Sequence, residues 1–140
     1  MRKFKLLGAL GLSLSVLAWA GDWRLVDANS EYAVSVNLES ISENAHWLEV
    51  DVDYLSVKPR ALEDEPGVYW RGMRFRERFD CVKTASATLG VKIFAGVPGR
   101  SRIIREEATP EDVPGDPAVV GSVGRAMIEL VCRHHERSNF

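Results

Sequence analysis

The stretch Val68–Cys81, VYWRGMRFRERFDC, decides the fold, because its side chains alternate between apolar and basic. Successive side chains of a β-strand point to opposite faces of the sheet. One parity is apolar: Tyr69, Met73, Phe75, Phe79 and Cys81. The other carries most of the charge: Trp70, Arg74, Arg76, Arg78 and Asp80. Arg71 and Glu77 interrupt the apolar parity, and Gly72 is a candidate bulge. The pattern predicts a strand with one buried face and one basic face.

The preceding run, His46–Val57, alternates in the same way. Its apolar parity consists of Leu48, Val50, Val52 and Tyr54. Its opposite parity is mainly acidic and consists of Trp47, Glu49, Asp51 and Asp53. An acidic row beside a basic row predicts an antiparallel pair of strands with cross-strand ion pairs. Each exposed pair should contribute only roughly 0–1 kcal/mol, so we expect its larger effect to be on strand register.

The rest of the chain predicts shorter strands and one helix. Four further alternating segments predict strands at Asp22–Asp27, Glu31–Leu38, Ala85–Ala95 and Ser101–Glu107. Three polar or proline-rich segments predict connections at Ser40–Asn44, Lys58–Gly67 and Thr109–Pro117. Prolines remove backbone donors, so no regular structure is expected in Thr109–Pro117. Lys58–Gly67 is long and solvated, which favours a mobile loop.

A helix is predicted over Val123–His134, with Ser122 as its N-terminal cap. The apolar stripe expected to face the core is Val123, Ala126, Met127, Leu130 and Val131, with Ile128 and Cys132 on its shoulder. The tail His135–Phe140 is expected to fray. Together these elements predict an α+β domain, a single twisted antiparallel sheet of about six strands with a C-terminal helix.

The first twenty residues predict export. A basic start is followed by the apolar run Leu6–Leu17 and the small-residue site Ala18-Trp19-Ala20, which is typical of a secretory signal peptide. We therefore divide the chain into a signal peptide, residues 1–20, and one domain, residues 21–140, exported by the Sec route to the periplasm or beyond. No later segment is apolar enough to span a membrane, and no cysteine follows the cleavage site, so no lipid anchor is expected.

Charge and cysteine content constrain the exported domain. Three of the 18 basic residues and none of the 20 acidic ones lie in the first twenty positions, so the remainder has a net charge of −5. This acidic balance argues against a nucleic-acid partner. The two cysteines, Cys81 and Cys132, are expected to form a disulfide in an oxidising compartment, which would tie the last helix to the sheet. Two reduced, buried thiols are the alternative.

The sequence contains no recognisable catalytic, metal-binding or cofactor-binding motif. Cys132, His134 and His135 do not have the spacing of a zinc site, and a disulfide would use the sulfur. No nucleophile-elbow motif accompanies His46, the one histidine outside the tail. We therefore expect no catalytic residue, no metal and no cofactor.

Two groups of residues are candidates for a binding surface. Arg74, Arg76 and Arg78, with Arg71 beside them, could hold carboxylates or sulfates, because guanidinium groups pair with such anions in a fork. The alternative is that these arginines only pair with the acidic row. Trp47 and Trp70 lie on the charged parities and could form an exposed aromatic spot, unless another part of the chain covers them.

The order of these parts resembles the surface-adhesin protein E family of small exported bacterial proteins. The matching features are Trp23, the strand end Arg78–Cys81, the hairpin Phe94–Gly99, Gly121-Ser122 before the helix, and Val131-Cys132 at its end. The resemblance implies a twisted antiparallel sheet whose C-terminal helix is tied to it by the disulfide. It departs at Val119-Val120-Gly121, where a tryptophan and a proline would be expected, and no binding residue of the family transfers to a position here.

The sequence and the resemblance together predict an exported, non-enzymatic interaction domain that binds a protein or a polyanion. The alternative is a periplasmic inhibitor or accessory module that acts on a cell-wall or secreted enzyme, with the loop Lys58–Gly67 as the inserting segment.

Overall fold

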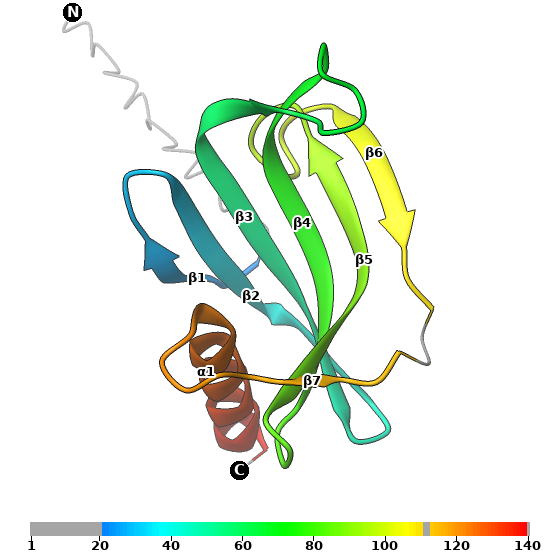
Figure 1. The fold of residues 1–140 in the computed structure, drawn as a ribbon. Helices are drawn as coiled ribbons and strands as arrows, with labels where there is room; N and C mark the ends of the chain where they lie inside the picture. The colour runs from blue at the N-terminus through cyan, green and yellow to red at the C-terminus, as the bar shows by residue number, and fades with distance from the viewer. Residues whose placement is uncertain (1–20, 111–112, 140) are drawn as a thin grey trace, which may run out of the picture.

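The computed structural model describes residues 21–110 and 113–139, and it shows an antiparallel sheet with a helix against one face (Figure 1). The elements are β1 (Trp23–Ala28), β2 (Tyr32–Asn44), β3 (Trp47–Ala61), β4 (Tyr69–Asp80), β5 (Ala85–Phe94), β6 (Ile103–Ala108), β7 (Asp116–Pro117) and α1 (Val123–Ser138). Strands β1 to β6 lie in chain order across the sheet, and the short β7 pairs with β5. This arrangement confirms the predicted fold class. The predicted signal peptide, residues 1–20, lies outside the described residues.

The register between β3 and β4 places the acidic row opposite the arginine row. The facing pairs are Glu49–Arg78, Asp51–Arg76 and Asp53–Arg74. Val52 and Phe75, which face each other between these pairs, point the other way and pack beneath α1. We call the face that α1 covers the helix face, and the opposite one, which carries both rows, the charged face.

The main hydrophobic core lies between α1 and the helix face. Its fully buried members are Val36, Val50, Phe79, Ile128 and Val131. Burying a side chain of this size stabilises a fold by roughly 1.5–3 kcal/mol. Because these residues come from β2, β3, β4 and α1, the core joins the middle of the sheet to the helix.

Helix α1 starts as predicted, and its predicted apolar stripe packs in the core except at Ala126. The Ser122 hydroxyl accepts a hydrogen bond from the backbone N–H of Arg125 at 3.1 Å, which caps the first turn. Ile128 and Val131 are the buried residues, whereas Ala126, assigned to the stripe, is exposed. Ile128 lies four residues before Cys132 and therefore on the same side of the helix. Ile128 and Cys132, which were assigned to the shoulder of the stripe, thus both face the sheet.

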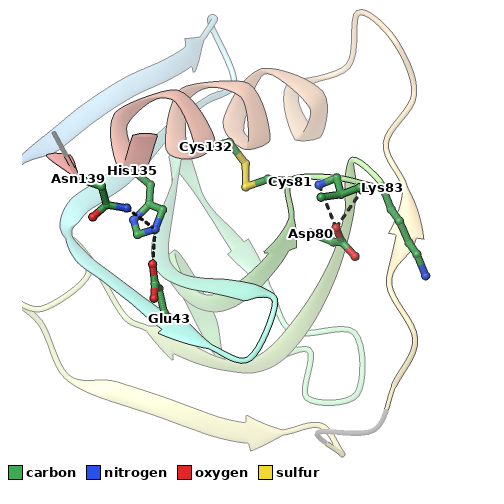
Figure 2. Close-up of a disulfide and its surroundings, with 8 residues drawn as sticks. Glu43, Asp80, Cys81, Lys83, Cys132, His135 and Asn139 are labelled. Carbon is green, nitrogen blue, oxygen red and sulfur yellow. Dashed lines mark hydrogen bonds and ion pairs between the residues drawn. A yellow bond between two sulfur atoms is a disulfide. The ribbon is translucent and has the colours of Figure 1, made fainter. Parts of the chain in front are cut away.

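The predicted disulfide between Cys81 and Cys132 is present (Figure 2). It joins the turn after β4 to the second half of α1, with the two Cα atoms 5.8 Å apart. The helix continues to Ser138, so the prediction that the chain frays from His135 is wrong. One turn after Cys132, His135 Nε2 lies 2.5 Å from a carboxylate oxygen of Glu43 in β2. This contact holds the end of α1 against the sheet.

Three predicted connections contain more regular structure than expected. Ser40–Asn44 belongs to β2, where a register shift against β3 lies between Asn37 and Ser42. Strand β3 continues past Val57 to Ala61, beyond a second register shift that accommodates Pro59. Thr109–Pro117 ends in β7, which pairs with the first two residues of β5. Bulges of this kind break the simple alternation on which the sequence prediction depends.

Candidate functional site

The centre of the charged face is a ladder of ion pairs between β3 and β4. Arg74 donates from Nε and Nη2 to the two carboxylate oxygens of Asp53, at 2.7 and 2.9 Å. Asp53 raises the pKa of the Arg74 guanidinium by accepting these bonds, while burial raises the pKa of the Asp53 carboxyl against the effect of Arg74. Both side chains are more than two-thirds covered. The pair therefore forms a fixed, electrically neutral unit.

Arg76 is held in the same way by several acceptors. Its Nη1 lies 3.1 Å from a carboxylate oxygen of Asp51 and 3.1 Å from the carbonyl oxygen of Ser40, and its Nη2 donates to the Ser42 hydroxyl at 3.0 Å. Arg76 therefore links β4 to β3 and to the end of β2. A polyanion could engage this guanidinium only in competition with these bonds.

Arg78 and Trp47 form the lower end of the charged face. The Arg78 guanidinium lies over the Trp47 ring, 4.4 Å from its centroid, and donates to the carbonyl oxygen of Val113. Gly115 packs against the same indole so closely that a Cβ there would come within 2.9 Å of it. Residues 113–115 therefore cross this end, and Gly115 covers part of Trp47.

Arg71 and Trp70 do not join the ladder. Arg71 donates from Nε to the carbonyl oxygen of Ser56 at 3.2 Å. Trp70 is only 9% exposed and packs with Leu62 and Ile93, so its ring adds no exposed aromatic spot to the charged face. The Trp70 ring also lies 6.1 Å from that of Tyr54, which packs against the main core, and the register shift of β3 lies beside it.

Two of the hollows on the charged face include Arg74. The larger, about 420 Å³, lies between β4 and β6 and is lined mainly by polar side chains with Leu89 and Val91. The smaller, about 220 Å³, lies beside Trp23 and has mostly apolar walls. The sequence analysis did not assign Trp23 or Leu89 to a site. The sequence offered one signal for Trp23, a tryptophan in a short strand. This signal does not show that a hollow lies beside the residue.

The predicted mobile loop is attached to the sheet. Arg105 of β6 lies 2.9 Å from a carboxylate oxygen of Asp64 and 2.6 Å from one of Glu65. Leu62, at the start of the connection, is buried against Trp70. The loop therefore lies against β6 and does not extend as the free arm that the inhibitor hypothesis requires.

Comparison with known proteins identifies the family of this fold. A sequence profile described as Surface-adhesin protein E matches residues 23–133. The chain belongs to the surface-adhesin protein E family. No curated protein sequence matches it. The surface-adhesin description indicates an exported protein.

Solved structures of protein E from Haemophilus influenzae share the fold. One, crystal form II, has a TM-score of 0.57 and 15% sequence identity, and the match covers 79% of this chain and 94% of that one. Another, from a non-typeable strain, has a TM-score of 0.59 and 14% identity, covering 83% of this chain and 78% of that one. At such low identity the likeness establishes the arrangement of sheet and helix and assigns no binding residue.

The adhesin-like domain carries no metal-binding cluster among residues 21–110 and 113–139: no three His, Cys, Asp or Glu side chains are placed together to hold an ion. Over the same residues, no helix has both the length and the apolar character needed to cross a bilayer.

An unusual carboxyl group lies on the helix face of this adhesin-like domain. Glu77 of β4 lines a hollow of about 210 Å³ with Phe75 and with Val123 and Met127 of α1. Burial raises the pKa of Glu77 to about 7, although the Thr88 hydroxyl, which donates to it at 2.6 Å, lowers the pKa. The sequence analysis noted Glu77 only as a break in the apolar parity. Its position beside Val123 and Met127 predicts that the stability of the domain depends on pH.

Proposed function

We propose that this chain is an exported, non-enzymatic adhesin-like domain that binds a protein partner through its charged face. The signal peptide, residues 1–20, would direct it through the Sec route to the periplasm or beyond. Membership of the surface-adhesin protein E family supports both export and a binding role.

The observation that carries the choice of partner is the pairing of the arginine row. Arg74 and Arg76 each bind a carboxylate of β3, so the cations that could attract a polyanion are largely neutralised within the domain. Rigid, paired charges beside a hollow with mostly apolar walls match the polar rim and apolar centre of protein–protein interfaces. A protein partner therefore suits this face better than heparin-like or nucleic-acid polymers.

A pair of double variants tests the proposal without changing net charge. Asp51→Ser/Arg76→Ser removes one ion pair from the charged face, and Arg125→Ser/Glu129→Ser removes one from the outer side of α1. Purified proteins are passed over immobilised extracellular-matrix protein and over immobilised heparin by surface plasmon resonance at physiological salt. We expect the wild type to bind the protein surface and the first variant to bind at least about tenfold more weakly, as for a central interface group.

The Arg125→Ser/Glu129→Ser variant should bind like the wild type, because its pair lies away from the charged face. Equal binding by both variants would exclude the charged face as the interface. Retention on heparin, lost on raising the salt concentration, would show that a polyanion is the better partner.

A further inference from the structure

We propose that the hollow beside Trp23 is the anchor pocket of the interface and receives one uncharged, apolar side chain of the protein partner. This inference rests on the proposed function in so far as it assigns the occupant to a protein. It adds a specific position, a specific chemistry and a role for Trp23.

The pocket is assembled from distant parts of the chain. Trp23 of β1, Leu55 of β3 and Pro98 of the β5–β6 connection supply its large apolar walls, and Ala33 and Ser35 of β2 lie between them. The Arg74–Asp53 pair forms its polar edge and continues into the larger hollow. The apolar pocket thus opens beside a polar, ion-paired surface, the arrangement in which interface hot spots occur.

The walls of the pocket are already fixed in the free protein. The Arg74 guanidinium lies over the Trp23 ring at 5.0 Å, and Gly99, whose φ is +77°, lies so close that a Cβ there would be 3.2 Å from Arg74 Nη2. Pro98 is buried against Gly72, where any Cβ would come within 2.5 Å of the proline ring. A partner would therefore lose little free energy in ordering this site.

The turn that carries Pro98 is closed by its own hydrogen bonds. The Ser101 hydroxyl donates to the carbonyl oxygen of Val97 at 2.8 Å and accepts from the N–H of Gly96 at 2.9 Å. The N–H of Arg100 also donates to the Val97 carbonyl oxygen, at 3.1 Å. These hydrogen bonds lie within the turn, so Val97 and Pro98 are held in position before any partner binds.

Electrostatic complementarity favours a neutral occupant. The charged side chains that line the pocket are Asp53 and Arg74, and both carboxylate oxygens of Asp53 accept from Arg74. A charged side chain entering the pocket would lose water and would have to compete with this ion pair. An aliphatic or aromatic side chain has no such cost.

The size of the pocket favours a single side chain over a cofactor or metabolite. Its volume of about 220 Å³ is below the roughly 300–1,000 Å³ that is usual for small-molecule sites. One leucine, proline or phenylalanine side chain is of the right order to fill it. The rest of the partner would then lie over the ion-paired ladder.

A titration with single amino-acid derivatives tests the pocket without knowledge of the partner. N-acetyl-leucinamide, N-acetyl-phenylalaninamide, N-acetyl-lysinamide and N-acetyl-aspartamide are added to ¹⁵N-labelled domain, and the indole N–H resonance of Trp23 is followed. We expect the two apolar probes to shift it with dissociation constants of roughly millimolar order, as their few heavy atoms allow, and the charged probes to leave it unchanged. No shift with the apolar probes, or equal shifts with all four, would overturn the inference.

A pocket-filling variant supplies the second measurement. Ala33→Phe places a ring in the hollow, and Ala126→Phe places the same ring on the exposed side of α1. Both variants are first checked for an unchanged circular dichroism spectrum and an intact disulfide. Ala33→Phe should abolish the probe shifts and weaken binding to matrix protein at least tenfold, whereas Ala126→Phe should change neither.

The two proposals can fail separately. If Ala33→Phe loses the probe shifts but binds matrix protein as the wild type does, the anchor role is wrong and the binding function stands. If the wild type binds no protein at all, the binding function and the anchor role both fail, whatever the probes do.

Discussion

Replacing Glu77 with glutamine should stabilise the domain at neutral pH and remove part of its pH dependence. Glu77 lies in the hollow beneath the first turns of α1, where its ionised form loses hydration. Its pKa is about 7 in the folded domain, against 4.5 for an unperturbed glutamate. Between these values the folded state binds more protons at this site than the unfolded state does. Stability is therefore highest below pH 4.5 with respect to this group, and it falls as the pH rises to 7.

The size of the effect follows from the shift. At about 1.4 kcal/mol for each pKa unit, ionisation of Glu77 costs the folded domain about 3 kcal/mol once the pH exceeds 7. The cost is about 1 kcal/mol at pH 5 and about 2 kcal/mol at pH 6. Glutamine is neutral at every pH and can still accept the hydrogen bond from Thr88. The free energy of unfolding of the variant should exceed that of the wild type by these amounts.

The measurement is urea unfolding followed by tryptophan fluorescence at pH 5, 6, 7 and 8, with the disulfide intact. Glu49→Gln is the matched control, because Glu49 lies on the charged face, away from α1. The difference in free energy of unfolding between Glu77→Gln and the wild type should grow from pH 5 to pH 8. The corresponding difference between Glu49→Gln and the wild type should not change with pH. A constant difference for Glu77→Gln, or a loss of stability at pH 8, would show that Glu77 is hydrated and ionised in the folded domain.

Three further changes test other parts of the structure. The bond between Cys81 and Cys132 closes a segment with a sequence separation of 51, so its reduction should lower the free energy of unfolding by about 4 kcal/mol. The reductant-treated protein should then have a lower urea midpoint, and an unchanged midpoint would contradict this. Phe79→Ala empties a fully buried site and should cost about 3–5 kcal/mol by the same assay, and a cost below about 1 kcal/mol would mean that the core repacks. Gly72→Ala should destabilise the domain by about 1–3 kcal/mol, because the new Cβ would come within 2.4 Å of the β5–β6 connection. Gly67→Ala is the control and should be close to neutral, because open space surrounds Gly67. Similar melting temperatures for the two variants would refute the close contact.

The alternation of β3 and β4 was predictable because strand periodicity and charge point to the same faces. Asp53 and Arg74 face each other as their parities require, and Arg74 keeps this pairing although its guanidinium also lies over the Trp23 ring. Cys81 and Cys132 were predictable because export and cysteine number leave few alternatives. These parts of the fold depend on local pattern or on simple chemistry.

The misassigned parts depend on contacts between distant segments. Trp70 has the parity of an exposed residue, but it is buried with Leu62 and Ile93, beside a register shift in β3. Ala126 has the spacing of the apolar stripe but is exposed, because helical periodicity alone does not determine which edge of the stripe meets the sheet. The Trp23 pocket combines four strands and a turn, so no window of sequence contains it.

The two faces of the sheet have different physical roles, and this division bears on how an adhesin-like domain can diverge. Val36, Val131 and the disulfide on the helix face stabilise the fold independently of the residues on the other side. On the charged face, Arg74 and Arg76 fix the strands while leaving almost no net local charge. Specificity there must come from the shape and apolar character of the hollows. Under the proposed function, substitutions around Trp23 are expected to alter partner binding without unfolding the domain.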